Sequence, residues 1–205
     1  MTETTAARSL TVKGERTRAK IVEVAASLMF QDGVAGTTVE TVCEAAGVGK
    51  SQIYHYFHDK AELVRTVIES HTERILSAYD PFLSTVSGWE SWDDWRDFIV
   101  DAQRDAECIG GCPLGSLARE LVDCDDLTRA LLIRSFQRWE LALMDAVQRM
   151  KDLGLIRPEA NNKFLATALL AGLQGGFLLC QTWRDVMPLQ ASLNSAIGLL
   201  RMYAA

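Results

Sequence analysis

The sequence predicts an all-helical protein, and two observations support this fold class. Only four prolines occur in 205 residues, and none falls inside a long periodic segment: Pro81, Pro113, Pro158 and Pro188. Apolar residues recur at helical spacing along most of the chain, whereas the alternation typical of strands is not sustained anywhere. A hydrophobic content of 48% is enough for a substantial core. We therefore expect a helical N-terminal unit followed by a larger helical C-terminal unit.

The N-terminal unit is expected to open with an amphipathic helix. Its apolar residues fall at i, i+3, i+4, i+7 and i+8 and form one face: Ile21, Val24, Ala25, Leu28 and Met29. Asp32 and Gly33 then provide a stop signal, because glycine is common just after the last turn of a helix.

Two short helices are expected next, with a glycine between them. A threonine pair at 37–38 stands where an N-cap is needed, and Gly47 ends the first of these helices. The second runs from about 50 to 58, with Ile53 and Phe57 four positions apart on its apolar side. Small residues before a tight turn and apolar residues after it let two short helices cross closely. This arrangement predicts a helix-turn-helix, with a longer helix beginning near residue 59.

The net charge of −6 is unevenly distributed along the chain. Residues 1–60 carry seven Lys/Arg and seven Asp/Glu, whereas residues 61–205 carry fourteen and twenty. Within residues 1–20 the five basic residues outnumber the two acidic ones: Arg8, Lys13, Arg16, Arg18 and Lys20 against Glu3 and Glu15. Such a local excess attracts phosphate, although a solvated basic tail would show the same count.

The second short helix is predicted to project polar side chains outward, and none of them is acidic. A surface without negative charges suits contact with a polyanion such as DNA. Lys50 can donate to guanine O6 and N7, and Gln52 can bridge adenine N6 and N7, so both are candidates for base reading. Ser51 suits either a base or a phosphate. Further candidates for contacts with the DNA backbone are Arg16, Arg18, Thr37, Thr38, Tyr54, His55, Tyr56 and Lys60. The two arginines could instead enter the minor groove. For Tyr56 a place in the core is an equal alternative, and for Phe57 it is the preferred interpretation.

The segment from about Arg16 to Leu63 resembles the DNA-binding domain of the TetR family of transcriptional regulators. The resemblance rests on the pattern T-x-x-x-h-x-x-x-A-G-V-x-x-x-x-h-Y-x-Y-F-x-x-K-x-x-L, which this chain matches from Thr38. It covers about a quarter of the chain. Gly49 departs from the family, in which many members carry serine, but its backbone N–H remains a possible phosphate donor. The resemblance implies a homodimeric repressor that binds a palindromic operator in double-stranded DNA and is released by a small-molecule inducer.

On this basis residues 1–62 are expected to form an N-terminal arm and DNA-binding domain, with a linking helix over about 59–78. Residues 63–205 are expected to form the effector-binding and dimerisation domain. Pro81 and Gly88 mark a break, after which helices are predicted near 89–107, 114–123, 125–153, 159–184 and 189–203.

The last two predicted helices are candidates for the dimer interface. The segment 159–184 is apolar nearly all round, as a helix with core on one side and a partner on the other requires. It contains small residues that allow close helix approach: Ala168, Ala171, Gly172, Gly175 and Gly176. The final helix adds Leu189, Leu193, Ile197, Leu200 and Met202 for a four-helix interface. A fully buried helix of a monomer would show the same composition.

Aromatic side chains are dense in the C-terminal unit and suggest a pocket for an apolar or aromatic inducer. The predicted lining, with Arg119 and Gln174 as polar anchors, is Trp89, Trp92, Cys112, Arg119, Phe136, Trp139, Gln174 and Phe177. An ordinary core is the alternative for each aromatic residue.

The segment from Cys108 to Glu120 resembles a G-C-x-h-G-x-h-A-x-E signature found in a subset of TetR-type repressors. Cys112 precedes Pro113 at the start of a predicted helix, where the helix dipole can lower a thiol pKa. Some relatives with a cysteine in this region respond to electrophiles or oxidants. The alternative is a small buried cysteine in a tight Gly-Gly turn.

No enzyme, metal site or cofactor is expected. The five cysteines form no zinc framework: Cys43, Cys108, Cys112, Cys124 and Cys180. A thiol-dependent enzyme would need a histidine near Cys112, yet all three histidines lie far along the chain from it, and no other catalytic motif occurs. The chain shows neither a secretory signal nor a run of about eighteen apolar residues, so a cytoplasmic protein that does not enter the membrane is expected. An activator, or a DNA-binding protein without an effector, remains open.

Overall fold

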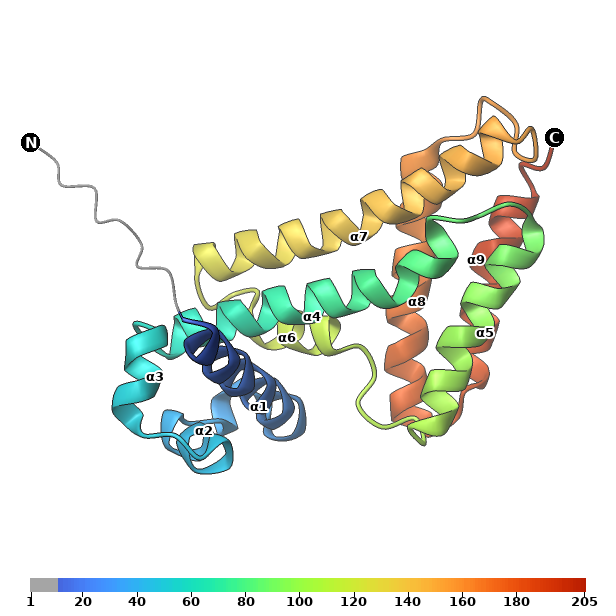
Figure 1. The fold of residues 1–205 in the computed structure, drawn as a ribbon. Coiled ribbons are helices and arrows are strands. Elements are labelled where there is room, and N and C mark those ends of the chain that lie inside the picture. The colour runs from blue at the N-terminus through green and yellow to red at the C-terminus, as the bar shows by residue number, and fades with distance from the viewer. Residues whose placement is uncertain (1–10) are drawn as a thin grey trace, which may run out of the picture. The chain divides into compact units, whose positions relative to one another are not determined.

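The computed structural model describes residues 11–205, and across these residues it contains nine helices and one isolated bridge between Ile156 and Ala204 (Figure 1). The predicted all-helical fold is confirmed. The chain divides into two compact units, residues 1–67 and 68–205. Arg8, counted above in the basic N-terminal segment, lies outside the described residues.

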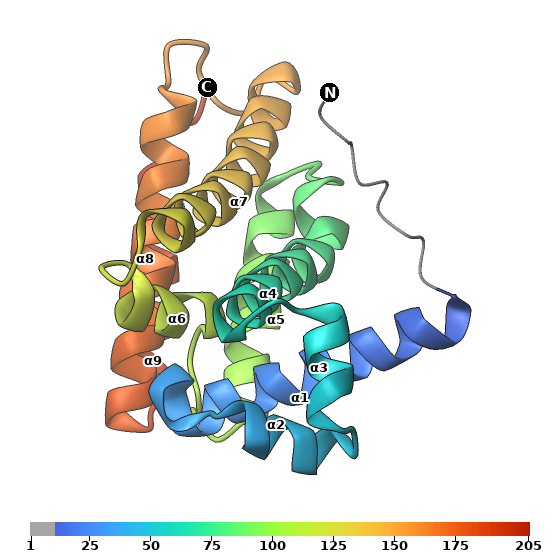
Figure 2. The same cartoon turned by 90° about the vertical axis from the view of Figure 1, so that its left-hand side faces the viewer.

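The first unit contains α1 (Val12–Gly36), α2 (Val39–Ala46), α3 (Lys50–Tyr56) and the beginning of α4 (Lys60–Leu83). Figures 1 and 2 show α2 beside α1, and α2 in turn contacts α3. The predicted stop at Gly33 is a kink: the backbone at Gly33 has φ 75°, but helical structure continues to Gly36. The core of the unit consists of fully buried side chains from all four helices: Ile21, Ala25, Val42, Ala46, Ile53, Phe57 and Leu63.

Local hydrogen bonds fix the turn between α2 and α3. The Thr38 hydroxyl accepts a hydrogen bond from the backbone N–H of Thr41, so Thr38 is the N-cap of α2, as predicted. Gly47 ends α2 in the left-handed conformation, with φ 65°, and its N–H donates to the carbonyls of Cys43 and Glu44. Glycine adopts this conformation without steric cost, so α3 can begin only four residues after α2 ends.

The second unit contains the rest of α4 and five further helices: α5 (Trp89–Asp105), α6 (Pro113–Leu121), α7 (Asp126–Asp152), α8 (Asn162–Trp183) and α9 (Met187–Arg201). These bounds agree with the predicted ranges to within a few residues. The linking helix is longer than predicted, because α4 continues through Pro81 and ends at Leu83. Pro81 lies in the last turn, so the helix ends two residues after it.

Helices α8 and α9 lie side by side and make the most extensive helix–helix contact of this unit (Figure 1). A Cβ added to Gly176 would lie 2.9 Å from Leu189 Cδ1, and the Ser192 hydroxyl donates to the Gly172 carbonyl at 2.6 Å. Close approach at Gly172 and Gly176 is therefore used within the chain. In contrast, Ala171 and Gly175 are exposed.

Among the described residues, α8 alone is long and apolar enough to cross a membrane, by length and composition only. This signal is weak because the core helices of soluble proteins meet the same criteria. In this structure α8 packs against both α7 and α9, as a core helix does.

Candidate nucleic-acid interface and inner cavity

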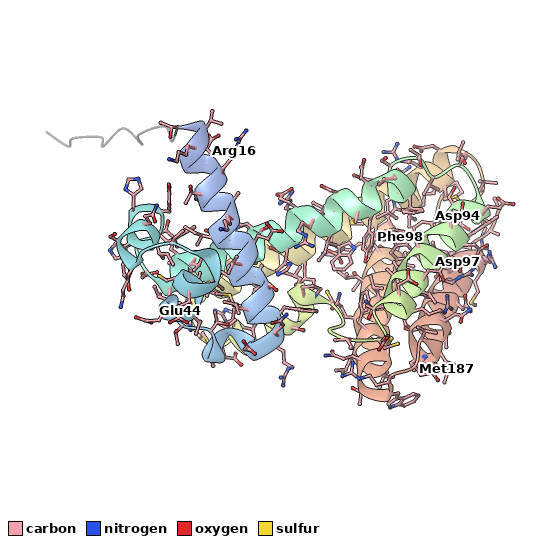
Figure 3. All side chains as sticks on the ribbon, turned by 60° about the horizontal axis from the view of Figure 1, so that its bottom comes forward. Arg16, Glu44, Asp94, Asp97, Phe98 and Met187 are labelled. Carbon is pink, nitrogen blue, oxygen red and sulfur yellow. The ribbon has the colours of Figure 1, made fainter. Side chains whose placement is uncertain are left out.

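A basic cleft of about 350 Å³ lies in the first unit, between α1 and the turn that joins α2 to α3. Residues of α1 one turn apart supply its cationic side chains, Lys13, Arg16 and Lys20, and Arg16 is seen on the N-terminal half of α1 in Figure 3. Gln52 of α3 lies on the opposite wall, and no acidic residue lines the cleft. This arrangement suits a phosphate backbone. Lys13 and Lys20 are not among the DNA contacts predicted from the sequence, although their i, i+3, i+7 spacing with Arg16 places all three on one side of a helix.

The polar face of α3 is open to solvent. Its predicted contact residues Lys50, Ser51, Gln52, Tyr54 and His55 are all exposed, and its apolar side is buried against the core of the unit. Helix α3 is therefore held by its apolar side, while its polar side chains face solvent.

Two of these polar side chains have partners within the first unit. Lys50 Nζ lies 2.5 Å from Glu40 Oε1 of α2. This hydrogen bond lowers the pKa of Glu40 and raises the pKa of Lys50, so both groups are charged. Gln52 Oε1 accepts a hydrogen bond from the Gly49 N–H at 3.2 Å, which uses the backbone donor that the sequence offers as a possible phosphate contact. The Gln52 amide nitrogen keeps its two donors.

Other predicted contact residues stabilise the fold of the unit. Thr37 is buried, and its hydroxyl donates to the Gly33 carbonyl at 2.8 Å. Arg18 places its guanidinium over the Phe57 ring, 5.1 Å from the ring centroid. Lys60 Nζ donates to the Val34 carbonyl at 2.7 Å. The hydroxyl of Thr37 is not presented to solvent, and the two cations have partners within the protein.

Tyr56 fits neither of its two predicted roles, DNA contact or core residue, exclusively. Its side chain is half-buried, and its ring contacts both His55 and Phe57, at centroid distances of 5.0 and 6.4 Å. Phe57 is fully buried, as expected for a core residue.

A pocket of about 140 Å³ that is partly open to solvent lies in the second unit, and we call it the inner cavity. Its lining comes from α4, α5, α7, α8 and the segment before α6: Ile75, Tyr79, Phe98, Ile99, Ala102, Gln103, Gly111, Cys112, Pro113, Trp139 and Phe177. Of the eight predicted pocket residues, it brings together Cys112, Trp139 and Phe177. Gln174 is next to them, because its Nε2 donates to Cys112 Sγ at 3.5 Å.

The other four predicted pocket residues do not line this cavity. Trp92 is fully buried and packs edge-on against Trp95 at 5.9 Å, so it is a core residue. Trp89 lies under the Arg201 guanidinium at 5.8 Å, Arg119 is exposed, and Phe136 is half-buried. Tyr79 and Gln103 also line the cavity but are not predicted from the sequence, since their helices show no signal that separates lining residues from ordinary core.

Cys112 is the N-cap of α6, and its sulfur accepts a hydrogen bond from the Gly115 N–H at 3.4 Å. The thiol is buried, and burial raises its pKa despite the hydrogen bonds from Gly115 and Gln174. The helix terminus therefore does not make this thiol acidic. Burial favours the structural interpretation of Cys112 over a reactive one.

The second unit also exposes apolar side chains on α8 and at both ends of α9. On α8, Phe164, Leu178 and Trp183 are 55%, 60% and 57% exposed. Met187, labelled at the start of α9 in Figure 3, is 52% exposed. We call these exposed apolar side chains, together with the exposed Ala171 and Gly175, the α8–α9 face.

Comparison with known proteins agrees with this geometry. The family model described as "Bacterial regulatory proteins, tetR family" matches residues 21–67, and that described as "Tetracyclin repressor-like, C-terminal domain" matches residues 92–196. A helix-turn-helix transcriptional regulator encoded in the lacX 3' region of Lactococcus lactis is 25% identical over 186 residues, covering 87% of this chain and 90% of the relative. The transcriptional repressor DhaR of Mycobacterium sp. strain GP1 is 25% identical over 182 residues, covering 86% and 88%.

Solved structures share the fold. A TetR-family transcriptional regulator from Cytophaga hutchinsonii superposes with a TM-score of 0.85 at 21% identity, covering 96% of this chain and 99% of the other. The matched families consist of transcriptional regulators, which is a non-enzymatic role. The second family match alone spans half of the sequence, and the first covers the helix-turn-helix. The chain therefore belongs to the tetR family of bacterial regulatory proteins and is a helix-turn-helix transcriptional regulator.

Proposed function

We propose that this protein is a cytoplasmic transcriptional repressor that binds a palindromic operator as a homodimer and is released by a small apolar or aromatic molecule. The observation that carries the proposal is the basic cleft beside the exposed, acid-free face of α3. The relative DhaR is named a transcriptional repressor, which supports repression rather than activation. We assign DNA binding to the first unit, effector binding and dimerisation to the second, and the link between them to α4.

In the proposed complex, α3 enters the major groove, and Lys50, Ser51 and Gln52 meet the base edges. Lys13, Arg16 and Lys20 hold the phosphate backbone along the basic cleft, and Thr38, Tyr54, His55 and Tyr56 add contacts at the rim. Thr37, Arg18 and Lys60 support the fold of the unit through the partners described above.

We assign the dimer to the α8–α9 face. A stripe of exposed apolar and small side chains on a helix is costly in water unless a partner covers it. A second copy of the same face gives a twofold interface and two recognition helices. On B-DNA, paired recognition helices read half-sites roughly 34 Å apart, which accounts for a palindrome.

The inner cavity is the proposed effector site. A ligand releases DNA only if it binds more tightly to the conformation that fits the operator poorly. Couplings of about 1 to 3 kcal/mol are typical and change occupancy by roughly 5- to 150-fold.

The test is a fluorescence anisotropy titration of the full chain against the DNA upstream of its own gene, at fixed salt and with non-specific competitor. Lys50→Ala or Gln52→Ala should weaken operator binding by about tenfold, since a good base contact contributes about 1 to 3 kcal/mol. Arg134→Ala, which removes an exposed charge from α7, is the control and should leave binding unchanged. If every DNA fragment binds equally and the α3 variants behave like the control, the operator-binding proposal is wrong.

A further inference from the structure

The side chain of Gln52 is held by the start of its own helix. Gln52 is the third residue of α3, and its Oε1 atom accepts the hydrogen bond from the backbone N–H of the N-cap, Gly49, at 3.2 Å. The first N–H groups of a helix have no partner within the helix, and a glutamine three residues after the N-cap commonly satisfies one of them in this way. Gln52 therefore supplies the acceptor that the Gly49 N–H needs.

Contact with DNA makes this hydrogen bond more important. Gln52 lies on the wall of the basic cleft together with Gly47 and Val48, the residues just before Gly49. DNA that covers the cleft displaces water from this turn, and a backbone N–H that loses its water has to keep another partner or its desolvation is not compensated. If Oε1 turned away to a base, the Gly49 N–H would lose its partner as the water leaves. We therefore expect Oε1 to stay at Gly49 in the complex.

The amide of Gln52 then presents donors to the DNA rather than an acceptor. A glutamine amide has one carbonyl oxygen and one nitrogen with two N–H donors, on the two arms of a planar group. With the oxygen held at Gly49, the nitrogen is the arm that can reach a base. The paired contact with adenine needs both arms, because Oε1 must accept from N6 while Nε2 donates to N7. Guanine presents two acceptors in the major groove, O6 and N7, so it fits the nitrogen arm alone.

The surroundings of Gln52 favour a base contact over a phosphate contact. Lys13, Arg16 and Lys20 line the same cleft and supply three positive charges for the phosphate backbone. Gln52 is neutral and lies in the first turn of α3, the part of a recognition helix that contacts base edges in helix-turn-helix proteins. Lys50 precedes it and is also a donor without an acceptor. The first turn of α3 therefore suits base edges rich in acceptors, which in the major groove are those of guanine.

We infer that Gln52 contacts guanine in each operator half-site, with Nε2 donating to O6 or N7, and not adenine, which the residue type alone would suit. Replacing that guanine with adenine should weaken binding by about tenfold, an effect within the range for one good base contact. The inference rests on the proposed binding of α3 to the operator and specifies one base of its sequence.

The test begins with a selection of DNA from a library of random duplexes by the full chain, followed by sequencing. The position contacted by Gln52 is the one at which Gln52→Ala loses the base preference of the wild type, and we expect guanine there. Anisotropy titrations at one salt concentration then compare duplexes with guanine and adenine at that position. The ratio of dissociation constants should be about tenfold for the wild type and close to one for Gln52→Ala.

Gln52→Glu tests the role of the two donors. It keeps the length of the side chain and an acceptor for the Gly49 N–H, but it removes both N–H groups. The preference should change from guanine to cytosine, whose N4 amino group donates to a carboxylate. Gln31→Glu, at an exposed position of α1 outside the cleft, is the matched control and should keep guanine. Guanine retained by a folded Gln52→Glu variant would contradict the inference.

The same selection separates this inference from the proposed function. If the wild type enriches a palindrome with adenine at the position contacted by Gln52, or if Gln52→Ala changes the preference at no position, the inference is wrong and operator binding stands. If the wild type enriches no sequence, specific operator binding fails, and the inference fails with it.

Discussion

Lys50, at the first position of the recognition helix, reaches back to Glu40 of α2. Both side chains are more than half exposed, and an exposed ion pair contributes little to stability. Its consequence is for recognition, because Glu40 restricts where the Lys50 ammonium can lie and places a negative charge next to it. DNA binding at Lys50 therefore has to replace a carboxylate contact with a base contact.

We predict that Glu40→Gln strengthens binding to random DNA and lowers the preference for the operator by several-fold. The variant removes one negative charge from the DNA-binding unit and frees Lys50 to contact any phosphate. The measurement is the ratio of dissociation constants for operator and random DNA at one salt concentration. Glu44→Gln is the control, since Glu44 is exposed on the same helix and changes the charge equally (Figure 3). An equal loss of preference in both variants would show that charge alone is responsible.

His71 gives a prediction about pH. It is 8% exposed in α4, and burial, assisted by the charge of Arg74, lowers its pKa to about 4. The unfolded chain binds a proton at this histidine near its ordinary pKa of about 6.5, whereas the folded chain does not. Stability must therefore fall as the pH drops through 6.5 towards 4.

His71→Gln should reduce this pH dependence. The wild type should lose roughly 1 kcal/mol more than the variant between about pH 7.5 and 5.5, as measured by urea unfolding. Parallel stability curves for the two proteins would show that His71 does not remain neutral in the folded state.

Among the helices, α8 packs tightly against α9 on one side and has open space on the other. On one side, Gly176 lets α9 approach so closely that a Cβ would lie 3.0 Å from Leu189 Cα. On the other side, a Cβ at Gly175 would meet nothing within 4 Å. Adjacent glycines in one helix thus serve different purposes.

Gly176→Ala should be about 1 to 3 kcal/mol less stable than Gly175→Ala in chemical unfolding. Both substitutions gain the same helix propensity, so at a protein concentration low enough to keep the chain monomeric, where no partner covers Gly175, their difference reports the steric cost at the α8–α9 contact. Equal stabilities would mean that α9 shifts to accept the methyl group.

For the molecule as a whole, the α8–α9 face is the proposed source of twofold symmetry. Leu178→Glu places a charge on this face and should convert the dimer to a monomer in sedimentation experiments. Operator affinity should then fall by at least a hundredfold, because one recognition helix reads only half of a palindrome. Ile133→Glu, at a 50% exposed position of α7, is the control and should leave the dimer intact. A dimeric Leu178→Glu variant that still binds its operator would move the interface elsewhere.

The sequence by itself determined the helices of this protein and its helix-turn-helix. Those features depend on neighbours within a few residues: the apolar period of Ile21 to Met29, the Thr38 cap and the turn at Gly47. Such signals are local, so they can be read without knowing which segments meet. They failed only in detail, at Gly33, where a stop signal became a kink, and at Pro81, where α4 continued for two more residues.

Only the tertiary structure decided which side chains are available at each candidate site. Thr37, Arg18 and Lys60 each have a partner within the protein that the sequence does not reveal, so a DNA contact at any of them competes with that partner. The aromatic residues of the second unit have similar sequence surroundings, yet Trp139 lines a cavity and Trp92 lies in solid core. The physical reason is that burial and pairing depend on side chains brought together from distant parts of the chain, whereas helix formation depends mainly on residues within one or two turns.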